Sequence, residues 1–264
     1  MRLDKHLVIN GFCPSREKAQ FAIQQKTVLV DGQIVDKPSK EISDEAQVEL
    51  IDIFNKYVSK GGLKLEKAIQ DFELDFSNSS VLDIGASTGG FTDCALQHGA
   101  SFVFAVDVGT EQLHESIRNN QSVQYLENKD FRDLNLEDTN HRIFQFIVSD
   151  LSFISLTYII SCIGKFMDKD TKIVFLIKPQ FEAGTSFLNK SGVVHDDKGY
   201  KIAIEKVVKE CLNHGLFLQN LTISTLWDKN KNVEFLALFS NKSSTYKINY
   251  DRLLSEIKIL KKKI

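Results

Sequence analysis

Four ionisable residues lie where the sequence predicts the end of a strand or the start of a helix. Lys64 is near the start of a helical segment, Asp150 and Lys178 each follow a short apolar run, and Glu234 begins another. Ligands of open α/β sheets bind beyond the carboxyl ends of the strands, so Asp150 and Lys178 are expected at that edge. Glu234 reaches the same edge if its strand runs antiparallel.

A site built from these side chains would move a proton or orient a hydroxyl group. A lysine that is partly desolvated beside another cation has a lowered pKa and can serve as a base. Neighbouring acids hold the geometry and offset the positive charge. Each residue taken alone is better explained as a solvated charge at a strand end, but the set of four favours a reaction centre.

A loop of small residues follows an apolar run within residues 81–92, which read VLDIGASTGGFT and then continue into a predicted helix. Such a loop lets a ligand approach the backbone closely. Asp107 closes the next apolar run, 22 residues after Gly85. An acid at that spacing is placed to accept hydrogen bonds from ribose hydroxyl groups.

The loop differs from GxGxxG and lacks the Lys-Ser/Thr pair of phosphate-binding loops, which disfavours NAD and nucleoside triphosphates. It suits a ligand that carries adenosine without a pyrophosphate, and S-adenosylmethionine fits that description. A glycine-rich turn without a ligand is the alternative. The order of strand, loop, helix and acid favours the cofactor site.

The composition describes an ordinary folded protein. The 264 residues include 33 Lys and Arg against 35 Asp and Glu, a net charge of -2, together with 19 Phe, 14 Gly and 3 Pro. The Phe content excludes a disordered chain, and the Gly and Pro contents exclude a collagen-like one. The near-zero charge argues against a uniformly basic surface but leaves room for a local basic patch.

Cysteines and apolar runs exclude several further classes. Cys13, Cys94, Cys162 and Cys211 are scattered, without a CxxC pair or a nearby pair of histidines, so neither a disulfide framework nor a zinc site is predicted. No apolar run approaches the ~18 residues of a membrane span, and no signal-peptide core follows the first residues. We therefore expect a cytoplasmic protein that binds no metal and no membrane.

The first 57 residues are predicted to form a small unit of two helices and short strands. Pro14 and Ser15 indicate a helix start with Ser15 as N-cap, Asp31-Gly32 indicates a hairpin, and a last strand is expected over 48–51. Residues 1–26 carry five basic and two acidic residues, a charge of +3, whereas residues 31–52 carry two basic and seven acidic, a charge of -5. The basic half can hold phosphate groups, and a solvated helix face is the alternative.

Strands alternate with helices through most of the remaining chain. This pattern predicts a mostly parallel sheet with helices on both faces. The last two strands are joined by the short segment 225–233 and are expected to pair antiparallel. Residues 241–264 are expected to form a peripheral helical tail with a frayed basic end. The predicted strands are 81–84, 102–106, 123–126, 144–149, 172–177, 218–224 and 234–239.

Short motifs in a fixed order along almost the whole chain resemble the TlyA (hemolysin A-like) rRNA methyltransferases, which combine an S4-like RNA-binding domain with an FtsJ/RrmJ-type methyltransferase domain. The matching motifs are RLD (2–4), SREKA (15–19), VLVDG (28–32), YVSKGGLKL (57–65), DIGASTGGFT (83–92), AVDVG (105–109), DLSFISL (150–156), KPQFEAG (178–184), GVV (192–194) and NVEFL (232–236).

The resemblance implies a Rossmann-like class I methyltransferase fold with a seven-stranded, mostly parallel sheet, preceded by a small α+β S4-like domain. The expected divisions are an S4-like RNA-binding domain over 1–57, a linker over 58–62, an FtsJ-like domain over 63–240 and the tail over 241–264. The implied activity is S-adenosylmethionine-dependent ribose 2′-O-methylation of ribosomal RNA, with ribosomal subunits as partners.

The resemblance also assigns residues to roles. Those matching the catalytic Lys-Asp-Lys-Glu set are Lys64, Asp150, Lys178 and Glu234. Those expected to bind the cofactor are Gly85, Ala86, Ser87, Gly89, Gly90, Phe91, Asp107, Val108, Asp130, Phe131 and Asp150. Those expected to bind RNA are Arg2, Lys5, Arg16, Lys18 and Lys60.

The sequence departs from the TlyA pattern in three places. Residues 129–132, KDFR, replace Asn-Ala-Arg and are closer to the FtsJ pattern, in which an Asp-Phe pair lies against adenine. Residues 227–232, WDKNKN, replace Gly-Pro-Lys-Gly-Asn, so the loop beside Glu234 is expected to have a different shape. Lys60 stands where Arg is common, which keeps the charge but loses a bidentate phosphate contact.

In the implied reaction a ribose 2′-oxygen attacks the sulfonium methyl group, with Lys178 as base or orienting group. Lys64 would lower the pKa of Lys178 and steer the RNA, Asp150 would hold the lysines in place, and Glu234 would complete the network. Three alternatives stay open: a membrane-active hemolysin-like protein, a catalytically inactive RNA-binding or ribosome-assembly factor, and a 2′-O-methyltransferase that acts on other RNA.

Overall fold

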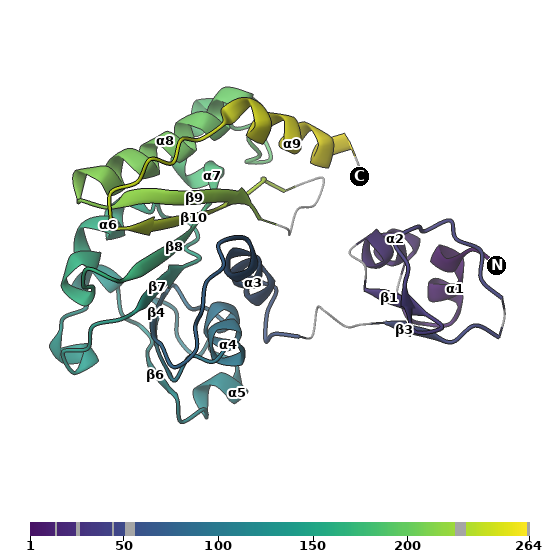
Figure 1. Cartoon of the computed structure of the whole chain (residues 1–264), viewed down its shortest axis with the longest axis horizontal. Coiled ribbons are helices and arrows are strands. Elements are labelled where there is room, and N and C mark those ends of the chain that lie inside the picture. The colour runs from purple at the N-terminus through teal and green to yellow at the C-terminus, as the bar shows by residue number, and fades with distance from the viewer. Residues whose placement is uncertain (14, 25–26, 44, 51–55, 225–230, 263–264) are drawn as a thin grey trace. The chain divides into compact units, whose positions relative to one another are not determined.

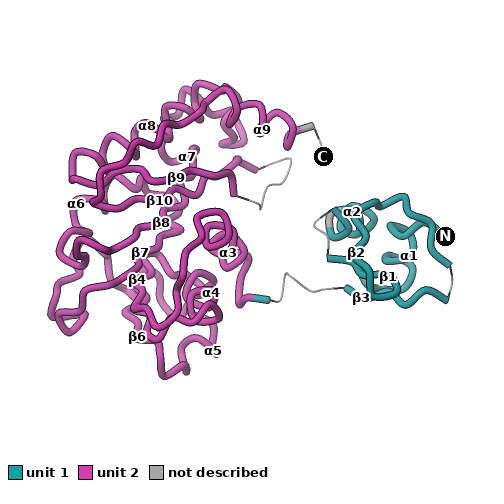
Figure 2. Tube along the Cα trace, viewed as in Figure 1, with its two compact units in different colours: residues 1–56 teal, residues 57–264 magenta. Residues whose placement is uncertain are grey.

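The computed structural model describes residues 1–13, 15–24, 27–43, 45–50, 56–224 and 231–262. The chain divides into two compact units, residues 1–56 and residues 57–264 (Figures 1 and 2). Pro14, Ile51, Lys263 and residues 225–230, on which several sequence predictions fall, lie outside the described residues.

The smaller unit packs two helices against a three-stranded antiparallel sheet of order β2-β1-β3. Ser15 caps the second helix, since its Oγ accepts a hydrogen bond from the Lys18 amide at 3.3 Å. Asp31 and Gly32 have φ of +52° and +74°, the left-handed geometry that the predicted hairpin needs. The elements are α1 (Leu3–Ile9), α2 (Arg16–Gln24), β1 (Val28–Val30), β2 (Gln33–Ile34) and β3 (Val48–Leu50).

The larger unit contains one seven-stranded sheet of order β6-β5-β4-β7-β8-β10-β9. β10 runs antiparallel to both of its neighbours, and the other pairings are parallel. The predicted mostly parallel sheet with an antiparallel last pair is therefore confirmed. The strands are β4 (Ser80–Ile84), β5 (Phe102–Val106), β6 (Val123–Leu126), β7 (Phe146–Ser149), β8 (Lys172–Ile177), β9 (Phe217–Ile223) and β10 (Phe235–Ser240).

Helices cover both faces of this sheet because the strands are apolar on both sides (Figure 1). Along β8, Ile173 and Phe175 belong to one apolar cluster, whereas Val174 and Leu176 belong to the other. The first cluster includes residues of α6, α8 and α9, and the second includes residues of α3 and α4. The helices are α3 (Gly61–Asp71), α4 (Gly90–Gln97), α5 (Glu115–Arg118), α6 (Thr157–Ile163), α7 (Pro179–Glu182), α8 (Asp197–Asn213) and α9 (Tyr250–Lys262), with short 3₁₀ turns η1 (Phe131–Asp133), η2 (Glu137–Thr139), η3 (Gly164–Phe166) and η4 (Thr185–Phe187).

The strand order reverses between β4 and β7, because β5 and β6 extend the sheet on one side of β4 while β7 and β8 extend it on the other. Such a reversal leaves a crevice beyond the carboxyl ends of the two central strands. Gly85 follows β4 and Asp150 follows β7. The fold therefore brings the glycine-rich loop and the first catalytic candidate to the same crevice.

Residues 58–62, expected as a linker, are packed onto the larger unit. Gly61 and Gly62 form the first turn of α3, and the Val58 amide donates to Asp93 Oδ2 at 2.8 Å. A Cβ atom on Gly62 would lie 2.3 Å from the Tyr57 ring, so this glycine lets the aromatic ring pack closely against the helix.

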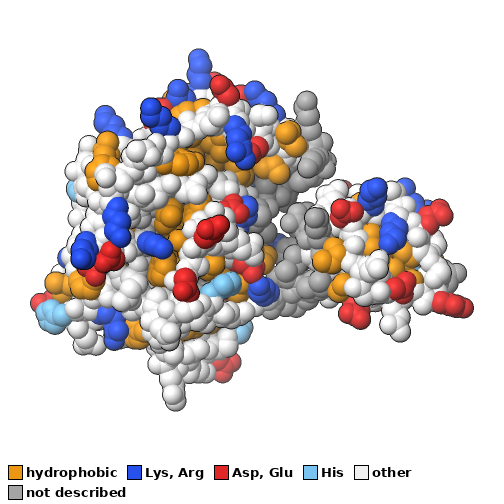
Figure 3. Space-filling model, viewed as in Figure 1, with side chains coloured by type: hydrophobic (Ala, Val, Ile, Leu, Met, Phe, Trp, Pro, Cys, Tyr) orange, Lys and Arg blue, Asp and Glu red, His pale blue; other side chains and the backbone are white. Residues whose placement is uncertain are grey.

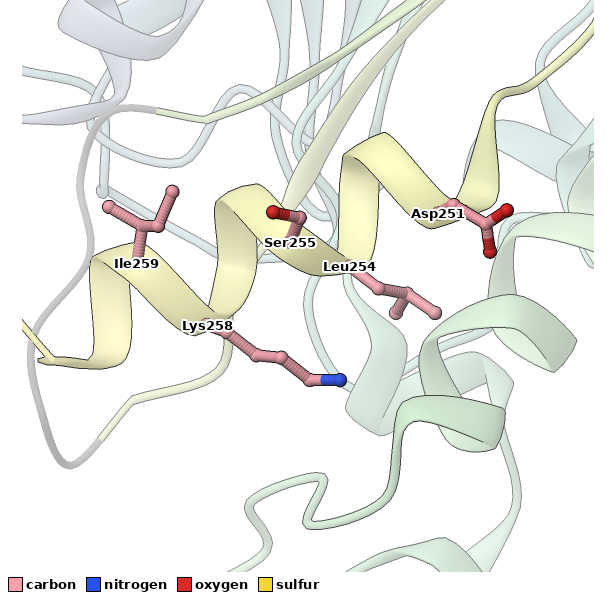
Figure 4. Close-up of a pocket in the computed structure, with 5 residues that line it drawn as sticks. All are labelled: Asp251, Leu254, Ser255, Lys258 and Ile259. Atoms are coloured by element: carbon pink, nitrogen blue, oxygen red, sulfur yellow. The ribbon is translucent and has the colours of Figure 1, made fainter.

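The C-terminal segment contains the expected helix, but α9 is more than a peripheral tail. Leu253 and Ile257, spaced one turn apart, are buried in the apolar cluster that α8 also joins. Lys258 Nζ lies 2.8 Å from Asp197 Oδ2 at the start of α8. Figure 4 shows five side chains of α9 that line a surface depression of 390 Å³, and among the described residues all of its lining side chains come from this helix.

Candidate active site

The loop between β4 and α4 depends on residues that tolerate left-handed backbone geometry. Gly85, Ser87 and Gly89 have φ of +81°, +49° and +90°. The Asp107 carboxylate ties this loop to the end of β5, because it accepts from the Ser87 amide at 2.8 Å and from the Gly109 amide at 2.7 Å. The predicted loop and its acidic partner are thus in contact, with the Asp107 carboxylate at the crevice.

Two features near the loop are compatible with a ligand that carries adenosine and a positive charge. Val108 follows Asp107 and leaves 66% of its apolar side chain exposed, a surface on which a base can rest. Asp83, on β4 just before the loop, is fully buried, and its Oδ1 has no hydrogen-bond partner among the described residues. Burial raises the pKa of Asp83 to about 7, a hydrogen bond from Thr92 Oγ1 at 2.7 Å opposes the shift, and the nearby charge of Asp150 adds to it.

Asp83 was absent from the residues predicted to form the site. The sequence places it in an apolar strand, but the lack of a partner for its Oδ1 among the described residues depends on which distant side chains the fold brings close to it. A cation bound nearby would stabilise the Asp83 carboxylate.

Three other residues predicted to bind the cofactor are buried in apolar clusters. Phe91 is buried in the apolar cluster of α3 and α4, and Ala86 is buried in a small cluster beside β5. Phe131 is also buried, with its ring 5.7 Å from that of Phe166, so the ring is part of the core instead of lying open for an adenine. Asp130 is partly exposed and is held by Arg132, whose Nη2 lies 2.5 Å from Asp130 Oδ2.

The four catalytic candidates form one connected ion cluster. Lys64 Nζ lies 2.8 Å from Glu234 Oε2 and 3.3 Å from Asp150 Oδ2. Lys178 Nζ lies 2.7 Å from Asp150 Oδ1. The side chains reach the crevice from α3 and from the ends of β7, β8 and β10, and the antiparallel direction of β10 delivers Glu234 to this edge.

The cluster is largely shielded from water, since its side chains are only 9–19% exposed. Burial acts to lower the pKa of Lys64, but the carboxylates of Asp150 and Glu234 outweigh it, so the pKa of Lys64 is raised. This is opposite to the lowered lysine pKa that the sequence suggested in general terms. Lys64 is therefore a fixed positive charge and not a base.

Lys178 is oriented by a third group besides the ion pair. Its Nζ donates a hydrogen bond to Ser152 Oγ at 2.6 Å. An ammonium group has three N–H donors, so with Ser152 hydrogen-bonded and the Asp150 carboxylate close by, at least one donor stays available. The Lys178 side chain can thus present a proton to a hydroxyl oxygen placed above the cluster.

Phe153 is a feature of the site that the sequence analysis missed. It follows Ser152, is 91% exposed, and has φ of +66°, an uncommon conformation for an aromatic residue. Its ring centre lies 5.6 Å from that of Phe181, which belongs to α7. The motif containing Phe153 was visible in the sequence, but its left-handed backbone conformation was not.

The residues predicted to bind RNA are divided between the two units. In the smaller unit the buried Asp4 holds Arg2, Arg16 and Gln20 at 2.9–3.0 Å. Hydrogen bonds from Arg2 first, and then from Gln20 and Arg16, lower the pKa of Asp4 against the effect of burial. Both arginines remain partly exposed, and Lys5 and Lys18 are exposed beside them. Lys60 is exposed immediately before α3 in the larger unit.

Basic and acidic side chains are interspersed on the face of each unit shown in Figure 3. In the described part of the chain, no cluster of three or more His, Cys, Asp or Glu side chains is placed to hold a metal ion. Among the helices of the described residues, none is both long and apolar enough to cross a membrane.

Comparisons with known proteins agree with both units. Residues 57–240 match the FtsJ-like methyltransferase family, and residues 1–48 match the S4 domain. Hemolysin A of Brachyspira hyodysenteriae is 41% identical over 239 residues, which are 90% of this chain and 99% of the relative. The 16S/23S rRNA (cytidine-2'-O)-methyltransferase TlyA of Mycobacterium tuberculosis is 36% identical over 235 residues, 89% of this chain and 87% of the relative.

A solved structure described as a hemolysin of Streptococcus thermophilus is 34% identical and superposes with a TM-score of 0.76, covering 100% of this chain and 97% of the other. The family match includes the glycine-rich loop and all four members of the ion cluster. The chain therefore belongs to the FtsJ-like methyltransferase family, with an S4 domain at its N-terminal end.

Proposed function

We propose that this protein methylates a ribose 2′-hydroxyl group of ribosomal RNA in the cytoplasm, with S-adenosylmethionine as methyl donor. The observation that carries the proposal is the ion cluster of Lys64, Asp150, Lys178 and Glu234 at the crevice beside the glycine-rich loop. The TlyA relative, whose name specifies a cytidine 2′-O-methyltransferase of 16S and 23S rRNA, supports the choice of substrate.

The cofactor, when bound, supplies an electrophilic methyl group. On the protein side, the backbone of residues 85–90 would cradle it, Asp107 would accept hydrogen bonds from ribose hydroxyl groups, and Val108 would support the base. Asp130 would accept a hydrogen bond from the base edge. The buried Asp83 would contribute a negative charge beneath the loop.

Lys178 would act on the 2′-hydroxyl group of the substrate. As an ammonium group it would direct its remaining N–H to the 2′-oxygen and orient a lone pair for attack, and the hydroxyl proton would pass to water. As a neutral amine it would accept the hydroxyl proton itself. Asp150 fixes Lys178 Nζ from one side and Ser152 fixes it from another. Lys64, which stays protonated, balances the two carboxylates and attracts the phosphate backbone.

RNA would contact both units. Arg2, Lys5, Arg16 and Lys18 would bind phosphate groups from the S4 domain. Phe153, exposed beside the cluster, would stack on a base of the target region.

The test is incubation of isolated ribosomal subunits with radiolabelled S-adenosylmethionine and either the wild-type protein or Asp150→Ala, followed by mapping of ribose-methylated nucleotides. We expect label with the wild type and at least about a 100-fold slower transfer with Asp150→Ala, because Lys178 and Lys64 both lose their shared partner. Cofactor affinity of the variant, measured by calorimetry, separates a loss of cofactor binding from a loss of methyl transfer.

Glu210→Ala is a suitable control, since Glu210 pairs with His214 on an exposed part of α8. The absence of label in both subunits would contradict the proposal. So would lysis of red cells by the purified protein without cofactor, the activity that the name of the Brachyspira relative suggests.

A further inference from the structure

Glu182, the last residue of α7, is a buried carboxylate that is not a member of the ion cluster. The Glu182 side chain is 1% exposed. Its Oε2 accepts from Ser155 Oγ at 2.5 Å, and its Oε1 accepts from the Leu156 amide at 2.8 Å. Lys206 on α8 supplies the compensating charge, with Nζ 3.1 Å from Glu182 Oε2 and 3.1 Å from Ser155 Oγ.

These contacts join the two chain segments that carry Asp150 and Lys178. The loop 151–156 follows Asp150, and α7 follows Lys178 and ends at Glu182. Ser152 is bonded to Lys178 at one end of the loop, while Ser155 and Leu156 are bonded to Glu182 at the other. The loop is therefore fastened at two points to residues 178–182.

The backbone between the two points needs such support. Phe153 has φ of +66° and is exposed, so apart from the contact of its ring with Phe181, its own side chain provides little packing to hold that conformation. A left-handed conformation is unfavourable for a residue with a Cβ atom and persists where neighbouring contacts determine it. Among the described contacts, those of Glu182 fix the far end of this strained segment.

We propose that Glu182 is a positioning residue for methyl transfer: it holds the loop 151–156 so that Asp150 and Ser152 meet Lys178 and Phe153 projects beside them. The inference deepens the proposed function and rests on it. A purely structural role would instead hold α6, α7 and α8 together without affecting the chemical step.

The test compares Glu182→Ala, Glu182→Gln and Ser155→Ala with the wild type, and uses Glu210→Ala as the matched control for loss of a glutamate. Single-turnover methylation with saturating RNA and cofactor reports on the chemical step. Misplacement of reacting groups by about 1 Å can slow a reaction by about 100-fold. We therefore expect Glu182→Ala to slow transfer by about 10- to 100-fold while cofactor affinity changes by less than about threefold.

Glu182→Gln keeps an amide oxygen that can accept from the Leu156 amide, so it should restore much of the rate. Ser155→Ala removes the hydroxyl group that bonds Glu182, Lys206 and Thr157 but leaves the carboxylate and its bond from the Leu156 amide in place. Its effect should therefore lie between those of Glu182→Gln and Glu182→Ala. Hydrogen exchange of the Leu156 amide measures the loop directly, and its protection should fall in Glu182→Ala.

The outcomes separate the two proposals. If the wild type methylates neither subunit, the proposed function fails. If the wild type is active and Glu182→Ala matches its rate although the Leu156 amide has lost protection, the positioning role is wrong. If Glu182→Ala fails to fold, wild-type rates of methyl transfer in both Glu182→Gln and Ser155→Ala would also contradict the positioning role.

Discussion

The charges of the ion cluster and of the basic residues around Asp4 are balanced by partners of opposite sign. Two carboxylates meet two ammonium groups in the ion cluster, and Asp4 meets two arginines in the S4 domain. Asp83 is different, because its hydrogen-bond donor is the neutral hydroxyl group of Thr92. A buried carboxyl group in such surroundings is protonated at a higher pH than usual, so Asp83 changes its charge near neutrality.

Asp83 should therefore make the stability of the larger unit depend on pH. Its pKa is raised from 3.8 to about 7, so between these values the folded state binds more protons than the unfolded chain. The free energy of unfolding then falls as the pH rises through this window, by at most about 1.4 kcal/mol per pH unit. Asp83→Asn lacks the titrating group and should gain stability relative to the wild type between pH 4 and pH 8.

Urea unfolding followed by circular dichroism at pH 4.5, 6 and 8 measures this difference. Comparing the two proteins at each pH removes the contributions of the other acids, including Asp4, whose lowered pKa acts in the opposite direction. Parallel pH profiles for the two proteins would refute the prediction.

At the scale of elements, local patterns were enough to predict most of the sheet. The bounds of β5, β6 and β8 agree with the predicted strands, because each is an apolar run flanked by polar residues. The antiparallel pairing of β9 and β10 followed from their short connection, and it places Glu234 beside Lys64.

What could not be predicted depends on contacts between distant segments. Glu182 is polar in sequence and buried in the fold, since its partners come from the loop after β7 and from α8. Phe131 was expected to face a ligand, but it lies where Phe166 of η3 completes the apolar core. The exposure of Phe153 likewise follows from a left-handed backbone and not from residue type.

The close packing of two loops at the crevice leads to a prediction for Gly85. Its φ of +81° is strained for alanine, and a Cβ atom there would lie 2.6 Å from Leu151 Cδ2. Gly215 has φ of +73° and no atom within 4 Å of a Cβ at its position, which makes Gly215→Ala a control for backbone strain alone. Both variants should lose about 1–2 kcal/mol of stability from the backbone.

Gly85→Ala should also displace Leu151, which adjoins Asp150, and should weaken cofactor binding and slow methyl transfer. Calorimetry with S-adenosylmethionine and single-turnover assays measure the two effects. If Gly85→Ala and Gly215→Ala behaved alike in both assays, the close packing of Gly85 against Leu151 would not contribute to cofactor binding or to methyl transfer.

For the whole molecule, the net charge of -2 conceals a separation of charge within the S4 domain. Residues 1–26 carry +3 and residues 31–52 carry -5. Asp4 fixes Arg2 and Arg16 on the basic part, whereas Lys37 and Lys40 are exposed within the acidic stretch. This distribution favours attachment to RNA through one patch over nonspecific coating of the polymer.

The salt dependence of ribosomal-subunit binding tests this picture in the intact chain. Each lost phosphate contact should reduce the slope of log affinity against log salt by about 0.7–0.9, because fewer counterions are released on binding. Lys5→Ala combined with Lys18→Ala should therefore weaken binding and lower the slope by up to about 1.8. Lys37→Ala combined with Lys40→Ala removes the same charge from the acidic stretch and should change the slope little. Equal slopes for the two double variants would show that total charge, and not the basic patch, governs the encounter with RNA.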